Sequence, residues 1–211
     1  MTPDTEGRRG GRQQKRSLLT RDALLDAAAR EVDAHGYGAV AMHHIAKAAE
    51  VTTGALTFHF PTKGDLFAEL TELGLARTRE RAEDVARLPA SPLRRISLLV
   101  LALLELLHRD VVVRAAVRLA RELPEVADAS EAYLPLSREL LREAGETGQL
   151  REGVTPDAVT EMIQYLVAGA EVCARGNTST PENADTARAH FTALRDLLLY
   201  GVSAVLPPGR E

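Results

Sequence analysis

The sequence predicts an all-α protein of about nine helices. Of its 211 residues, 45% are hydrophobic and only 4% are aromatic, and tryptophan is absent. Alanine, leucine and valine recur at helical spacing rather than in strict alternation, a pattern typical of helices. Proline and glycine interrupt these runs at intervals, so they indicate where one helix ends and the next begins.

Charge is distributed unevenly along the chain. The net charge of −4 argues against nucleic acid as a partner, yet basic residues outnumber acidic ones before residue 64 and acidic residues dominate after it. Residues 1–17 form a Gly- and Gln-rich stretch without apolar periodicity and are predicted to be a flexible basic arm. The arm either stays solvated or contacts a polyanion through its Arg8, Arg9, Arg12, Lys15 and Arg16.

The cysteine content and the absence of a leader segment predict a reducing, cytoplasmic environment. Cys173 is the only cysteine, so no internal disulfide forms. The longest apolar stretch, "LLVLALLELL" at 98–107, contains Glu105 and is too short to span a bilayer. We therefore expect a buried helix there and no membrane association.

Three short helices are predicted at the start of the chain, at 20–35, 41–49 and 53–60. Thr20 is a suitable N-cap for the first, and His35-Gly36 ends it. Thr52 caps the third, and Pro61 stops it.

The rest of the chain is predicted to form six longer helices. Thr62 begins the fourth, with Asp65 at the N3 position of a capping box, and this helix runs to about 87. The others are expected at 92–109, 110–122, 130–145, 156–174 and 181–205. The resulting organisation is a basic arm (1–17), a three-helix domain (18–64), a larger helical domain (65–206) and a tail (207–211).

The third helix has one apolar side and one side of small polar residues. Leu56, His59 and Phe60 share the first, whereas Thr53, Gly54 and Thr57 share the second. Two short helices joined by a tight turn form the layout of a helix-turn-helix, whose second helix enters the DNA major groove. Small residues allow close approach of the backbone to base edges. The alternative is that the helix belongs to a simple bundle and only packs against its neighbours.

The residues next to this helix suggest where phosphates bind. Lys63 lies at the N-terminus of the fourth helix, where unpaired N–H groups already favour an anion. His59 either donates to a second phosphate or packs between helices.

Residues 24–70, "LLDAAAREVDAHGYGAVAMHHIAKAAEVTTGALTFHFPTKGDLFAEL", resemble the N-terminal domain of TetR-family transcriptional regulators. The similarity lies in the I-A-x-x-A turn, the Gly-x-Leu helix, the His-Phe ending and the following lysine. "GALTFHF" is most similar to the γ-butyrolactone receptor branch. The similarity continues more loosely in "VVVRAAVRLARE" (111–122), "LLREAGETGQLREGV" (140–154) and the closing helices.

The resemblance implies a bacterial, ligand-responsive repressor that binds a palindromic operator in double-stranded DNA as a homodimer. Four positions depart from the branch: Thr53 replaces Lys, Thr57 replaces Tyr, Ala41 replaces a Ser/Thr cap, and Glu50 replaces a turn glycine. We expect these changes to weaken or redirect binding and the basic arm to compensate. The expected DNA-contacting residues are Thr52, Thr53, Gly54, Ala55, Thr57, His59 and Lys63, together with His43, Arg12 and Arg16.

The resemblance also implies an effector pocket in the C-terminal domain. In the branch, a tryptophan three residues beyond a tyrosine contacts the lactone; Leu136 stands at that place here, which suggests a pseudo-receptor with another small apolar or amphiphilic effector. His108 and Tyr165 are further polar candidates. The expected lining residues, each of which alternatively belongs to the core, are Leu99, Leu103, Leu107, Val113, Val117, Tyr133, Leu136, Leu140, Ile163, Gln164 and Val167.

The last two helices are expected to form the homodimer interface. Each has an apolar stripe with small residues, and two such helices per chain build a four-helix interface across a two-fold axis. The alternative is that both helices are internal.

Two other classes of function stay open from the sequence. One is a helical interaction or decoy regulator with weakened DNA binding, and the other is a helical enzyme that uses an apolar pocket and His108. No nucleophile elbow, P-loop or dinucleotide motif is present, and His35, His43, His44 and His59 lack partners at metal-ligand spacing. We therefore expect no enzyme activity, no cofactor and no metal.

Overall fold

The computed structural model describes the backbone of residues 5–123, 128–175 and 181–204, with side chains from residue 17 onward except at 181–185. Over these residues the chain forms nine α-helices and one short 3-10 helix, without a strand. The predicted all-α fold is confirmed.

The N-terminal helices are α1 (Thr5–His35), α2 (Met42–Ala48) and α3 (Thr53–His59). Gly36 ends α1 with a φ of 79°, a conformation that glycine adopts without strain. The side chain of Thr52 accepts a hydrogen bond from the Ala55 amide, as the predicted N-cap requires.

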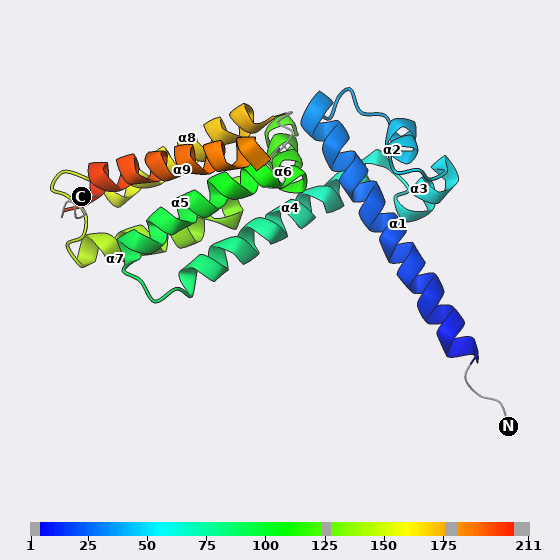
Figure 1. Cartoon of the computed structure of the whole chain (residues 1–211), viewed down its shortest axis with the longest axis horizontal. Coiled ribbons are helices and arrows are strands. Elements are labelled where there is room, and N and C mark those ends of the chain that lie inside the picture. Colours follow the sequence, from blue (N-terminus) through cyan, green and yellow to red (C-terminus); the bar gives the residue numbers. More distant parts are fainter. Residues whose placement is uncertain (1–4, 124–127, 176–180, 205–211) are drawn as a thin grey trace.

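The predicted start of the first helix was wrong. The backbone is helical from Thr5, so Thr20 lies inside α1 and residues 5–17 are not an irregular arm. Arginine, glutamine and lysine are good helix formers and no proline interrupts 5–35, so the helix extends despite its glycines. Figure 1 shows these first turns extending away from the rest of the molecule. The side chains of Arg12 and Arg16 lie outside the described residues.

Helices α4 (Lys63–Ala86), α5 (Pro92–Arg109) and α6 (Val111–Glu122) follow, and α4 begins at its predicted cap. Thr62 and Asp65 form the complete capping box at the start of α4. Ser91 caps α5, with Pro92 in its first turn. The junction between α5 and α6 is a single residue, Asp110, whose side chain caps α6.

The final elements are the 3-10 helix η1 (Ala129–Ala132), α7 (Leu134–Glu146), α8 (Pro156–Ala174) and α9 (Pro181–Val202). The helix predicted at 130–145 is therefore divided at Tyr133. Pro135 fits this division, because it lies in the first turn of α7 and has no N–H to donate to a carbonyl one turn earlier.

Two hydrophobic cores meet at α6. The N-terminal core joins α1, α2 and α3 to the first turns of α4 and to Val112, Ala115 and Leu119 of α6. The larger core surrounds α5, against which α4, α7, α8 and α9 pack. Figure 1 shows α4 extending from the C-terminal bundle to the N-terminal helices, with α6 at the junction.

Helices α4 and α6 are almost in backbone contact where they cross. A Cβ atom added to buried Gly74 of α4 would lie 2.4 Å from the Cβ of Ala116 and 3.1 Å from the carbonyl oxygen of Val112. No side chain fits between two helices at that distance, so glycine is required at this crossing.

We expect Gly74→Ala to lower the free energy of unfolding by about 1–3 kcal/mol, because overpacking outweighs the better helix propensity of alanine. Urea denaturation measures the change. Gly64→Ala in the first turn of the same helix is the control, since its added Cβ meets only the Thr62 hydroxyl at 3.5 Å. Equal stability of the two variants would contradict the proposed close crossing.

Candidate DNA-binding surface and ligand pockets

Helix α3 presents the predicted small polar side to solvent. Thr52, Thr53, Gly54 and Thr57 are exposed, and Ala55 is half-buried. On the opposite side Leu56 and Phe60 are buried in the N-terminal core. The helix is thus fixed by its apolar side, and its small residues form an accessible surface.

The hydroxyl groups on this surface are partly used within the helix. The Thr57 hydroxyl donates to the carbonyl oxygens of Thr53 and Gly54, at 3.1 and 3.2 Å. At Gly54 an added Cβ would meet nothing closer than the Thr52 hydroxyl at 3.9 Å. The surface therefore offers mainly backbone, Cβ and methyl groups for close approach to a partner.

Phe58 is an exposed aromatic residue that the sequence analysis missed. Its side chain is 81% exposed and its ring lies edge-on to that of half-buried His59, with centroids 5.3 Å apart. The signal was available, because Phe58 falls outside the helical side that contains Leu56 and Phe60. A large apolar side chain on an otherwise short-chained surface is suited to van der Waals contact with a partner.

Lys63 does not stand free at the N-terminus of α4. Its ammonium donates to the carbonyl oxygen of Tyr37 at 2.7 Å and lies 4.1 Å from the centre of the Tyr37 ring. Burial lowers the pKa of this ammonium. At the helix N-terminus, Asp65 accepts from the Thr62 amide and hydroxyl, and its own amide donates to the Thr62 hydroxyl. In this structure Lys63 therefore holds the loop after α1, and its contact with a phosphate stays a prediction.

The turn between α2 and α3 contains the strained residue that the sequence predicted. Glu50 is exposed and has a φ of 55°, in the left-handed region that favours glycine. Ala41 precedes α2 without a side-chain cap, and His43 is exposed beside His44. The turn therefore keeps its left-handed conformation at Glu50, although no glycine is present there to relieve the strain.

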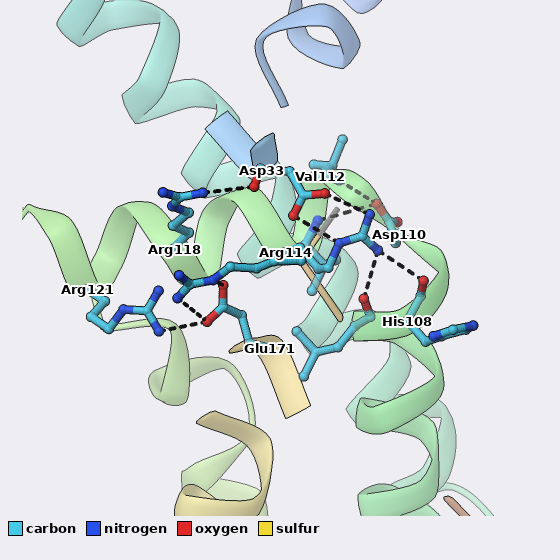
Figure 2. Close-up of polar contacts among 11 residues, drawn as sticks. Asp33, His108, Asp110, Val112, Arg114, Arg118, Arg121 and Glu171 are labelled. Carbon is cyan, nitrogen blue, oxygen red and sulfur yellow. Dashed lines mark hydrogen bonds and ion pairs between the residues drawn. The ribbon is translucent and has the colours of Figure 1, made fainter. Parts of the chain in front are cut away.

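A buried ion pair joins the N-terminal domain to α6. The guanidinium of Arg114 donates to both carboxylate oxygens of Asp33 in α1, at 3.0 Å each, and both residues are buried. Arg114 also donates to the carbonyl oxygens of Leu107 and His108 at the end of α5. One side chain therefore connects α1, α5 and α6 (Figure 2).

Further polar contacts continue on both sides of this pair. Arg118 donates to the backbone carbonyl of Asp33 and pairs with Glu122, which in turn accepts from the Tyr37 amide. On α8, the fully buried carboxylate of Glu171 pairs with Arg121 at 2.7 Å and with Arg175 at 2.9 Å (Figure 2). Burial raises the pKa of Glu171, whereas the hydrogen bond and charge of Arg121 and the charge of Arg118 lower it.

Most of the predicted pocket residues belong to the C-terminal core. Leu136 is partly buried against that core, and the fully packed members are Leu99, Leu103, Leu107, Val113, Leu140 and Ile163. The remaining four, Val117, Tyr133, Gln164 and Val167, do line a cavity of about 420 Å³ between α6, η1 and α8. Burial raises the pKa of Tyr133 to about 12, and Arg121 and Asp128 add charge to this cavity.

A larger cavity, of about 520 Å³, lies between α8 and α9 with α5 at its base. The sequence analysis did not locate it, although it named His108 and Tyr165 as polar candidates. Leu104 and His108 of α5, Ala170 of α8 and Phe191 of α9 are among its lining residues. Apolar side chains form most of its surface.

Comparison with known proteins identifies the N-terminal part. Residues 24–70 match the family described as bacterial regulatory proteins, tetR family. Residues 24–70 are therefore similar to the N-terminal domain of TetR-family regulators. A segment of 75 residues is 41% identical to the HTH-type transcriptional regulator AcrR of Shigella flexneri, and this match spans 35% of each protein.

Solved structures extend the similarity to most of the chain. A γ-butyrolactone receptor described as an ArpA-like protein is 27% identical with a TM-score of 0.67, covering 87% of this chain and 97% of the receptor. CprB from Streptomyces coelicolor, in complex with its biological operator sequence, is 25% identical with a TM-score of 0.66, covering 87% and 98%. The likeness therefore includes the helical C-terminal domain.

The described part of the chain holds no cluster of three or more metal-ligating side chains. None of its described helices has the length and apolar character needed to cross a membrane. The names of AcrR and of the γ-butyrolactone receptor describe a transcriptional regulator and a receptor.

We expect Asp33→Ala to lower the free energy of unfolding by about 3–5 kcal/mol, because it leaves the Arg114 guanidinium buried without its counter-charge. Urea denaturation measures the loss. Asp26→Ala is the control in the same helix: Asp26 pairs with Arg30 on the exposed surface, and its removal should cost less than about 1 kcal/mol. Similar losses in the free energy of unfolding for both variants would show that the buried pair contributes no more to stability than the exposed pair.

Proposed function

We propose that this chain is a homodimeric, ligand-responsive transcriptional repressor that binds a palindromic DNA operator through α3. The observation that carries the proposal is the exposed small-residue side of α3, in a domain that matches the TetR family over 24–70. A helix with short side chains on its outer face fits the major groove, because the backbone comes within reach of base edges.

Binding by this surface depends on apolar contact more than on charge. The Thr57 hydroxyl donates within α3, and one donor of the Lys63 ammonium is used by the Tyr37 carbonyl, so both have reduced capacity for a phosphate. Phe58 is exposed beside the small residues and is suited to contact thymine methyl groups. The basic first turns of α1 supply the phosphate contacts in this proposal, through Arg12 and Arg16.

The homodimer is proposed to form through α8 and α9, because both helices expose apolar stripes. Tyr165 is 75% exposed and Leu197 is 69% exposed. Soluble monomers rarely leave a contiguous apolar area of this kind in water. The exposed residues that belong to the two stripes are Met162, Tyr165 and Val172 of α8 and Leu194, Leu197 and Tyr200 of α9.

The alternative function is a decoy regulator that has the fold but binds DNA weakly. Strained Glu50 favours it, because its carboxylate adds negative charge next to the surface that must approach phosphates. Measured DNA affinity decides between the two functions.

We expect the purified chain to retain specific fragments of its own genomic DNA in mobility-shift assays, and Gly54→Glu to weaken this binding by at least about tenfold. The added side chain fills the space that the DNA backbone or base edges need, and its charge repels phosphates. Thermal unfolding should be unchanged, because Gly54 is exposed.

The control for added charge is Leu88→Glu, an exposed position beyond the end of α4, which should leave DNA affinity unchanged.

Deletion of residues 1–16 should lower both the affinity and its dependence on salt, since each lost phosphate contact reduces the slope by about one. Absence of any salt-sensitive footprint in the unaltered chain would support the decoy instead.

We expect Leu197→Glu to convert the dimer to monomer, because a charge in the centre of an apolar interface is buried without a partner. Sedimentation velocity at several concentrations measures the change. Leu88→Glu again serves as the control, because its leucine is exposed elsewhere on the surface and should leave the dimer intact. A monomeric unaltered chain would refute the proposed interface.

A further inference from the structure

We infer that DNA binding by this chain is coupled to proton uptake, because the exposed histidines His43 and His44 of α2 hold the DNA backbone when their imidazoles are protonated. Affinity for DNA should therefore fall as the pH rises through the range in which histidine loses its proton, about pH 5 to 8. The inference rests on the proposed function, because it concerns the same DNA-binding surface. It adds a dependence on pH that this function does not require.

The two histidine side chains lie next to each other on the surface of the N-terminal domain. Both are exposed, and their ring centroids are 4.2 Å apart with an angle of 57° between the rings. A protonated imidazole donates through both of its nitrogens. A phosphate that lies against the pair can therefore accept from both rings, and its negative charge offsets the repulsion between them.

The place of α2 in the domain brings this pair towards a DNA backbone. In a helix-turn-helix the second helix enters the major groove, while the first helix crosses the backbone. Here α2 is the first helix and α3 the second, and the two pack against each other. Figure 1 shows both on the outer side of the N-terminal domain, away from the C-terminal bundle that contains α8 and α9. The proposed dimer interface therefore leaves the histidine pair exposed.

The charge of this surface depends on its histidines. Residues 42–59, which form α2, the turn and α3, contain one lysine, Lys47, and one acidic residue, Glu50. Both are exposed and their charges cancel, so this segment is neutral while its histidines are neutral. Protonation of the exposed pair His43 and His44 is therefore the main source of positive charge with which α2 and α3 meet a phosphate.

No carboxylate of the described residues pairs with either ring. Helices α1 and α3 are the main neighbours of α2, and His59 is the only titratable side chain on α3. From residue 17 onward, the charged or titratable side chains of α1 are Arg21, Asp22, Asp26, Arg30, Glu31, Asp33 and His35. Arg21, Arg30 and Asp33 form ion pairs, but with Glu69, Asp26 and Arg114 rather than with the histidines. A phosphate of bound DNA would thus be the counter-charge that stabilises the protonated pair.

Thermodynamic linkage gives the direction and the size of the effect. Binding that favours the protonated form takes up protons, so low pH strengthens it and rising pH weakens it. Each proton taken up changes the affinity by about tenfold per pH unit within the range of titration. The arginines in the first turns of α1 stay charged throughout this range, so their phosphate contacts add no dependence on pH.

The test uses the full chain and a fluorescently labelled genomic fragment that is retained in the mobility-shift assay. We expect the dissociation constant, measured by anisotropy at constant salt, to rise about tenfold or more between about pH 6 and pH 8.5. Isothermal titration calorimetry near pH 7 in PIPES and in imidazole, two buffers of different ionisation enthalpy, counts the protons directly. An uptake of about one proton per subunit is expected.

Matched variants assign the protons to the pair. The double variant His43→Gln/His44→Gln has no titratable group there and should bind at about pH 6 as weakly as the unaltered chain binds at about pH 8.5. The double variant His43→Arg/His44→Arg carries fixed charges and should bind tightly with little dependence on pH. The control is His35→Gln, an exposed histidine at the end of α1, which should keep the pH dependence of the unaltered chain.

The possible outcomes separate this inference from the proposed function. DNA binding with equal heats in both buffers and no change with pH would overturn the coupling and leave the repressor intact. Proton uptake that persists in the double glutamine variant would also overturn it, because other groups would then be the ones that titrate. Absence of binding at every pH in the range would refute both the repressor and the coupling.

Discussion

The buried pair between Arg114 and Asp33 is the constraint that fixes the two domains relative to each other. Removing two charges from water is costly, and their attraction compensates only when the remaining donors are also satisfied. Arg114 meets that condition, because it also donates to the carbonyl oxygens of Leu107 and His108. A hydrophobic contact in its place would tolerate sliding, whereas this bidentate geometry selects one position of α1 against the end of α5.

The sequence was sufficient for those features whose cause is local. Thr52, the Thr62–Asp65 box and Ser91 each satisfy amides within three residues, so the starts of α3, α4 and α5 could be predicted. The start of α1 could not be predicted, because no capping residue before Thr20 marks it. The good helix formers in that stretch extend the helix instead. The contact of Lys63 with Tyr37 could not be predicted, because Tyr37 is remote in sequence and approaches only in the folded domain.

The cavities are less determined by the sequence for a different reason. Periodicity shows which side of a helix is apolar, but a leucine that lines a cavity and a leucine that only packs have the same pattern. Leu99, Leu103 and Leu104 all belong to the buried C-terminal core, yet only Leu104 also lines the cavity between α8 and α9. The difference depends on how far apart α8 and α9 lie on α5, which the spacing of apolar residues does not specify. The buried Asp33–Arg114 pair was missed likewise, because each residue alone is typical of an exposed helix surface.

The close crossing of α4 and α6 determines how a change in the C-terminal domain would reach α3. Gly74 and Ala116 leave no room for one helix to slide over a bulky side chain of the other, so the two helices shift together at this point. The capping box ties the first turn of α4 to the residues that follow α3, and Lys63 ties it to the loop after α1. Because α6 is joined to α5 by Asp110 alone, rotation at the end of α5 moves α6 directly. A displacement at the end of α5 would therefore reach α3 through one rigid unit, and in the proposed dimer the separation of the two α3 helices is the quantity to which a palindromic site would be sensitive.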